Sequence, residues 1–134
     1  RNSCDQALRL FHQAGFPKEM LLMGAAFYSR KWENVKDRYH GFLQYTEKGG
    51  GYGPNYDELA EKNIDKNGYV SYWDDEAKAP FLFNGSTFIS YDDERSLSCK
   101  CKYVKEEGIG GIFYWCHTGD TSGVLLRKIG EEIR

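Results

Sequence analysis

Aromatic and basic side chains follow two long apolar runs, and they are the residues best placed for ligand chemistry. Tyr28 and Arg30 come directly after Met20–Phe27, and Trp115 ends the run Ile109–Trp115. Apolar runs rich in β-branched and aromatic residues are typical of strands buried on both faces. In alternating α/β units, ligands bind at the carboxyl ends of such strands. The spacing therefore predicts a ligand site that contains Trp115, although an aromatic ring at this position also suits a packed core.

Two acidic clusters, Asp74-Asp75-Glu76 and Asp92-Asp93-Glu94, have the composition of paired catalytic carboxylates. The second stands directly before a helical stretch, where carboxylates accept hydrogen bonds from free N–H groups and face the positive end of the helix dipole. The first follows a strand-like run and is typical of a solvated turn. We therefore interpret both clusters as structural. His117 has no apparent serine or cysteine partner, and we interpret it as a loop residue.

The four cysteines are interpreted as reduced and structural. Cys4, Cys99, Cys101 and Cys116 have neither the spacing of a zinc site nor that of a disulfide framework. We expect neither a metal nor a cofactor.

The remaining elements follow from capping residues, turns and periodicity. Ser3 with Gln6 fits a capping box that opens a helix, and Gly15 with Pro17 ends it. The glycine-rich stretch 48–54 is expected to be a loop. The other expected elements are a short helix over 55–62, a strand over 69–73, a hairpin over 80–91, a helix from Asp92 or Asp93 to Gly108, and a helix over 123–133.

Composition narrows the classes of partner. The chain has 134 residues, a net charge of −2 and a pI of about 5.9, so no basic face suggests nucleic acid or an anionic membrane. No apolar run approaches the roughly 20 residues that span a bilayer. The chain begins at Arg1 without a methionine, which is consistent with a removed signal peptide or with one that was never included.

Four ordered motifs carry a resemblance to a known family. These are Y-S-R after the first apolar run, W-D-D-E-A-K-A-P-F-L-F, F-I-S-Y-D-D-E-R-S and G-I-G-G-I-F-Y-W. Together they resemble the carboxyl-terminal part of a glycoside hydrolase family 18 chitinase. The resemblance implies an α/β fold, the C-terminal portion of a (β/α)8 TIM barrel that carries a small α+β insertion domain. It implies a barrel segment over 1–31 (sixth helix and seventh strand), the chitinase insertion domain over 32–90, and a barrel segment over 91–134 (seventh helix, eighth strand and eighth helix).

The catalytic signature of that family is absent. The pattern D-x-x-D-x-D-x-E occurs nowhere in the 134 residues, and a complete barrel needs about 200 residues or more. The family hydrolyses β-1,4-linked N-acetylglucosamine polymers by substrate-assisted retaining catalysis, in which a glutamate protonates the leaving oxygen. The resemblance therefore implies a chitinase fragment without catalytic residues, and this segment alone is expected to be inactive.

The resemblance also assigns substrate-binding residues. Trp115 resembles the tryptophan that forms the apolar floor under the sugar, a role that suits a flat ring. Tyr28 and Arg30 resemble the cleft-lining residues of Y-G-R, with Ser29 in place of the family's glycine. Trp73 and Asp74 resemble a W-D pair that faces the cleft, and packing within the insertion is an equal alternative for Trp73.

Three functions from different classes remain open. The chain is part of an active chitinase, part of a non-hydrolytic chitin-binding relative, or a scaffold segment without a usable site. We expect chitin or N-acetylglucosamine oligosaccharides as partners, a secreted or cell-surface location, and no nucleic acid or membrane. Because a partial barrel leaves strand edges unpaired, the isolated fragment is also expected to form a homodimer.

Overall fold

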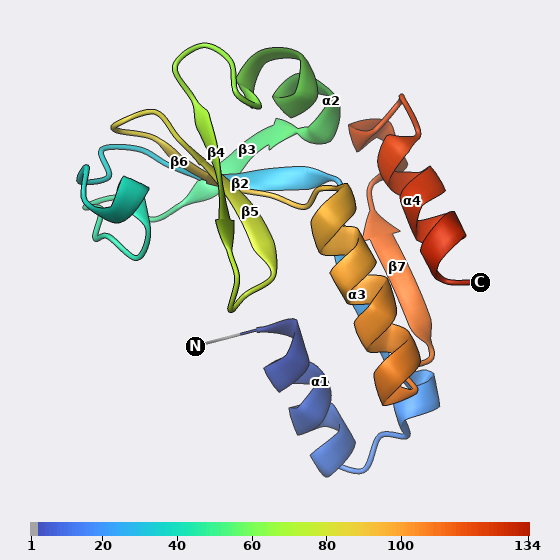
Figure 1. The fold of residues 1–134 in the computed structure, drawn as a ribbon. Coiled ribbons are helices and arrows are strands. Elements are labelled where there is room, and N and C mark those ends of the chain that lie inside the picture. Colours follow the sequence, from blue (N-terminus) through green and yellow to red (C-terminus); the bar gives the residue numbers. More distant parts are fainter. Residues whose placement is uncertain (1–2) are drawn as a thin grey trace.

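The computed structural model describes residues 3–134 and has two parts, shown in Figure 1. A small antiparallel sheet with its loops and a short helix lies on one side. Three longer helices with a pair of parallel strands lie on the other. In chain order the helices and strands are α1 (Cys4–Gln13), β1 (Leu22–Ala26), β2 (Tyr28–Trp32), β3 (Gly51–Asn55), α2 (Tyr56–Glu58), β4 (Val70–Asp74), β5 (Ala79–Phe83), β6 (Phe88–Ser90), α3 (Glu94–Glu107), β7 (Gly111–Trp115) and α4 (Val124–Glu132).

The parallel pair β1–β7 is covered by helices on one face only. Met23, Ala25 and Phe27 pack into two clusters with residues of α1, α3 and α4. The opposite face is open, since Leu22 is 52% exposed and Phe113 is 50% exposed. The expectation that both runs are buried on both faces is therefore wrong. The part of the chain that the structure describes places no element over this second face.

One edge of β1 pairs with β7. The other edge of β1 is hydrogen-bonded by side chains of α3 and of the segment that precedes α3. Phe27 N–H donates to Trp115 C=O, so the N–H group of Phe27 points toward β7. Because successive residues of a strand direct their N–H and C=O groups to opposite edges, those of Gly24 and Ala26 point away from β7. Ala26 N–H donates to the Asp92 carboxylate at 2.9 Å, and Lys100 Nζ donates to Gly24 C=O at 2.9 Å. Two backbone groups of this edge are thus satisfied without a neighbouring strand.

Helix ends follow the capping expectations. Ser3 accepts a hydrogen bond from Gln6 N–H at the start of α1. Asp93, with Ser96, forms a capping box at the start of α3. Gly108 ends that helix with a φ of 67°, a left-handed conformation that glycine adopts without strain. Asn55 caps α2, which continues as a π-helical turn over Leu59–Asn63.

The second sheet is antiparallel, with strand order β3-β2-β6-β5-β4. The expected hairpin is confirmed as β5–β6, with Phe83 paired to Phe88. The expectation of a loop holds for residues 48–50 and is wrong for residues 51–54, because Gly51–Asn55 forms the edge strand β3. Glycine permits this pairing at close range. A Cβ on Gly53 would lie 2.4 Å from the Ser29 hydroxyl oxygen.

One continuous segment joins the two parts. β1 leads through Phe27 directly into β2, which pairs with β3 and β6 rather than with β7. The expected boundary between residues 31 and 32 therefore falls inside β2. The division into segments 1–31, 32–90 and 91–134 stays a prediction.

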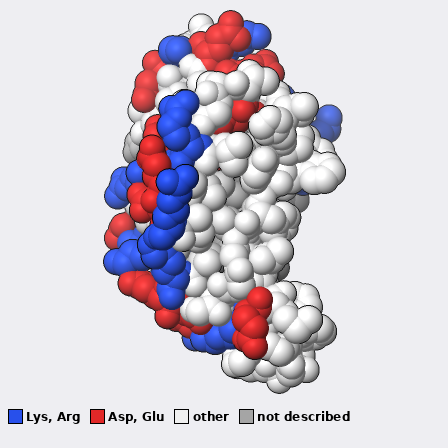
Figure 2. Space-filling view, turned by 90° about the vertical axis from the view of Figure 1, so that its right-hand side faces the viewer, with Lys and Arg blue, Asp and Glu red and all other residues white. Residues whose placement is uncertain are grey.

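Charged side chains avoid one surface of the molecule. Viewed from the side of α4 and β7, Lys, Arg, Asp and Glu gather along one border and at the two ends, and most of the broad middle is uncharged (Figure 2). The exposed apolar residues of β1 and β7 are Leu22, Phe113 and Trp115. Among the described residues, no helix is long and apolar enough to cross a membrane.

We predict that Gly110→Ala destabilises the fold strongly. A Cβ at this position would lie 2.0 Å from the carbonyl oxygen of Glu19 and 3.1 Å from that of Leu21, so backbone must move. The expected loss is about 1–3 kcal/mol of unfolding free energy, as for overpacking, measured by urea denaturation.

Gly130→Ala is the matched control, because its Cβ would meet nothing within 4 Å inside α4. It should be neutral or add up to about 1 kcal/mol. A Gly110→Ala protein as stable as wild type would contradict the packing described here.

Candidate functional site

Trp115 ends β7 with its side chain largely in solvent, 67% exposed. It is opposite Ala26 in the parallel register. Its carbonyl oxygen accepts the Phe27 N–H at 2.8 Å, and the peptide bond to Cys116 is cis. The backbone of Trp115 is therefore held within the sheet while its ring stays available to a ligand.

Tyr28 and Arg30 lie on the same face as Trp115. Burial alternates along this segment. Met23, Ala25, Phe27 and Ser29 are buried, and the residues between them are partly exposed. Since neighbouring strands in register direct their side chains to the same side, the face that carries Trp115 and Ala26 continues through Tyr28 and Arg30. Three of the five residues singled out from the sequence are thus directed to one side of the strands.

Arg30 is held by two contacts from the glycine-rich edge. Its Nη2 donates to Gly50 C=O at 3.1 Å, and its guanidinium carbon lies 4.9 Å from the ring centroid of Tyr52. Tyr52 also meets Tyr28 edge to face, with ring centroids 5.5 Å apart. Only glycine fits at residue 50, since a Cβ would lie 2.2 Å from the Trp32 ring. This close approach brings the Gly50 carbonyl to Arg30.

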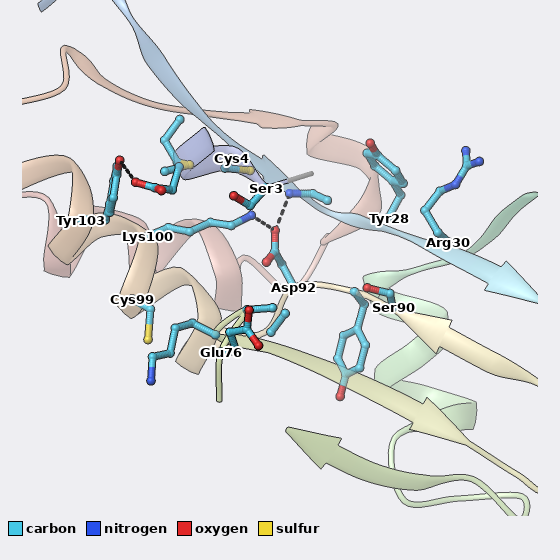
Figure 3. Close-up of a pocket in the computed structure, with 17 residues that line it drawn as sticks. Ser3, Cys4, Tyr28, Arg30, Glu76, Ser90, Asp92, Cys99, Lys100 and Tyr103 are labelled. Atoms are coloured by element: carbon cyan, nitrogen blue, oxygen red, sulfur yellow. Dashed lines mark hydrogen bonds and ion pairs between the residues drawn. The ribbon is translucent and has the colours of Figure 1, made fainter. Parts of the chain in front are cut away.

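A cavity of about 740 Å³ opens beside Tyr28 and Arg30. Figure 3 shows it between residues of α1 and α3 and residues of the antiparallel sheet. Lys100 and Asp92 form an ion pair at 2.5 Å in its wall, and both side chains also bind the edge of β1. Glu76 lines the same cavity from the turn between β4 and β5. The carboxylate of Asp92 thus has a structural role, as expected from the sequence.

Trp73 and Asp74 lie outside the residues that line this cavity. The Arg95 guanidinium lies 3.7 Å from the ring centroid of Trp73, and Trp73 Nε1 donates to Asp75 at 3.3 Å. Asp74 accepts from the backbone N–H groups of Glu76 and Ala77 and so shapes the turn. The hydrogen bond from Lys78, with a weaker one from Trp73, lowers the pKa of Asp75. A sugar-binding role for Trp73 and Asp74 stays a prediction.

Sequence reasoning missed two residues beside the site, Asp57 and Tyr52. Asp57, in the first turn of α2, accepts hydrogen bonds from the backbone N–H and the hydroxyl of Thr121, both on Oδ2 and at 2.9 and 2.7 Å. Thr121 lies in the loop that follows Trp115 and precedes α4, so this contact joins that loop to α2. Hydrogen bonds from Thr121 lower the pKa of Asp57. Neither residue has a local sequence signal, because both contacts join distant segments.

Tyr56, next to Asp57, is a structural tyrosine. Burial raises its pKa to about 12, with a smaller contribution from Glu94. Its backbone N–H donates to Phe27 C=O at 3.1 Å.

The described residues contain no group of three or more His, Cys, Asp or Glu side chains that suits a metal. All four cysteines are free.

Comparison with known proteins gives one consistent result. Residues 1–120 match the family described as Glycosyl hydrolases family 18. The chain is 36% identical to chitinase A1 of Niallia circulans over 128 residues, which are 90% of this chain and 18% of that protein. It superposes on a glycoside hydrolase family 18 N-acetylglucosaminidase from Paenibacillus barengoltzii with a TM-score of 0.97 and 48% identity, covering 98% of this chain and 39% of that one.

A more distant solved structure contains a sugar. The class V chitinase of Nicotiana tobaccum, solved in complex with NAG4, is 25% identical with a TM-score of 0.78, and the match covers 96% of this chain and 38% of that one. The chain therefore spans less than half the length of each relative described here.

We predict that the contact between Asp57 and Thr121 stabilises the protein in a pH-dependent way. A carboxylate whose pKa is lower in the folded state contributes stability above its ordinary value near 3.8, and this contribution is lost as pH falls through the folded pKa. Asp57→Asn should lower the melting temperature at pH 7, and the difference from wild type should shrink at about pH 3. Asp37→Asn, in the exposed loop after β2, is the control. A difference that stays constant with pH would contradict the assignment.

Proposed function

We propose, because this chain belongs to glycosyl hydrolase family 18, that it supplies a binding face for β-1,4-linked N-acetylglucosamine oligosaccharides. Its fold is the C-terminal portion of a (β/α)8 barrel with an α+β insertion, as expected from the sequence. The observation that carries the proposal is the exposed ring of Trp115 at the carboxyl end of β7, on the face shared with Tyr28 and Arg30.

The chemistry of these three side chains suits a pyranose. A flat indole offers a large apolar surface to the C–H face of a sugar and loses little rotamer entropy on binding. The Arg30 guanidinium offers donors in a rigid fork, and one of them is already used on Gly50 C=O. The remaining donors can reach hydroxyl or acetamido oxygens. The Tyr28 hydroxyl can both donate and accept.

Hydrolysis requires a group that this chain does not contain. The motif D-x-x-D-x-D-x-E is absent from the 134 residues, so we propose that the chain alone binds without cleaving. For the whole protein we propose chitin hydrolysis by substrate-assisted retaining catalysis, with the acid glutamate supplied by a part of the barrel outside this chain. A secreted or cell-surface location fits an insoluble extracellular polymer.

A second candidate is a non-hydrolytic chitin-binding protein, because the stretch that would carry the catalytic motif lies outside this chain. Both candidates use the same face of β1, β2 and β7 for sugar. They differ in whether a catalytic glutamate accompanies this chain. Measuring product release from the complete protein therefore separates them, whereas binding by this chain does not.

We predict that this chain binds chitotetraose and that Trp115→Ala weakens the binding about tenfold or more, as for a central aromatic anchor. Calorimetric titration measures the affinity, and chromatography of the same samples should show no shorter product. Tyr45→Ala is the control, because Tyr45 is an equally exposed ring, 77% accessible, in the loop between β2 and β3. An unchanged affinity for Trp115→Ala would refute the assignment. Product release would require an acid in this chain, and Glu76 and Glu94 would be the first residues to replace.

We also propose that the isolated chain, in the absence of sugar, forms a homodimer through the open face of β1 and β7. Burial of the exposed apolar side chains Leu22 and Phe113 would drive the association. Light scattering should show a dimer that dissociates on dilution, and Phe113→Ser should shift the equilibrium toward monomer. Leu10→Ser, at an exposed position of α1, should leave it unchanged. Monomer alone at high concentration would contradict the proposal.

A further inference from the structure

Tyr52 is an exposed aromatic ring that packing does not explain. It lies on the edge strand β3 and is 75% exposed. The residues at 50, 51 and 53 are glycines, so neither residue directly adjacent to Tyr52 has a side chain that could shield the ring. A ring with this exposure contributes little to a hydrophobic core. A role in ligand binding would explain this exposed position.

The contacts of Tyr52 connect it to the face that carries Trp115. Tyr52 is opposite Arg30 in the register of β2 and β3, and the guanidinium lies over its ring. Its ring meets Tyr28 at a centroid separation of 5.5 Å and an interplanar angle of 62°. Both contacts restrict the ring to one orientation before any ligand arrives. Such preorganisation lowers the entropy cost of binding.

The environment of the ring is polar on one side and open on the other. Arg30 occupies one side of Tyr52 and is itself held by Gly50 C=O. The high exposure of Tyr52 leaves apolar surface free for a ligand. A pyranose that lies on this surface keeps its hydroxyl groups near the Arg30 donors. This combination of flat apolar area and adjacent fixed donors suits a sugar better than a purely apolar ligand.

We infer that Tyr52 forms an additional sugar subsite, next to the position bound by Tyr28 and Arg30. The inference rests on the proposed function, since it extends the same face toward the edge of the antiparallel sheet. The affinity for sugar should therefore increase with the length of the oligosaccharide. A disaccharide is held at Trp115, Tyr28 and Arg30, and a longer β-1,4-linked N-acetylglucosamine chain also reaches Tyr52.

The test is a calorimetric titration of this chain with chitobiose and with chitotetraose, for wild type and three variants. Wild type should bind the tetrasaccharide more tightly. Tyr52→Ala should weaken tetrasaccharide binding about threefold to tenfold, the range for one aromatic contact, and weaken disaccharide binding less, because Gly50 C=O still holds Arg30. Tyr52→Phe should restore the wild-type value, because it keeps the ring. Tyr45→Ala should match wild type with both ligands.

Failure of the inference differs from failure of the proposed function. If wild type binds both sugars and Tyr52→Ala changes neither affinity, Tyr52 is not a subsite and the proposed function stands. Equal losses for the disaccharide and the tetrasaccharide would also overturn the inference, because they would indicate that Tyr52 acts only by holding Arg30. If wild type binds neither sugar, both the subsite and the proposed function fail. Melting temperatures close to wild type in all variants would show that the fold is intact.

Discussion

The backbone of Phe27 is the junction on which the rest of the structure depends. Its N–H donates to Trp115 C=O and its own carbonyl accepts from Tyr56 N–H, so this one residue joins β7, the start of α2 and the end of β1. Its ring is 1% exposed and stacks on Tyr114 at a centroid distance of 4.6 Å. Gly119 packs so closely that an added Cβ would lie 2.3 Å from the Phe27 carbonyl oxygen. The position of the Trp115 backbone relative to the start of β2 follows from this junction.

A site built at such a junction combines rigid backbone with exposed side chains. Asp92 and Lys100 hold the outer edge of β1, and Asp57 holds the loop after Trp115. These polar contacts fix the backbone without covering the rings, which a core contact would bury. The apolar surface left in solvent lowers the stability that burial would supply. That surface is also what a sugar can contact, so the same exposure that costs stability provides the binding face.

Local signals predicted much of this fold, and non-local pairing accounts for what they missed. Ser3, Asp93 and Gly108 mark helix ends through contacts within a few residues, and the hairpin at Asn84-Gly85 is equally local. The strand β3 escaped prediction because its glycines indicate a loop, and only pairing with β2 makes it extended. Tyr52 and Asp57 were missed for the same reason, since their partners Arg30 and Thr121 lie 22 and 64 positions away. The burial of both faces of β1 and β7 was wrong because it assumed neighbours that the described chain does not place there.

Chemical-shift mapping by NMR can show whether one continuous face of β1, β2 and β7 binds the sugar. Chitotetraose is added to the isotopically labelled chain, and the shifts of backbone amides and of the three tryptophan indole N–H groups are followed. Binding at this face should change the shifts of the Trp115 indole and of the Tyr28 and Arg30 amides, with no change at Tyr39 and Tyr45 in the exposed loop. Changes confined to that loop or to the Trp73 indole, with Trp115 unaffected, would contradict it.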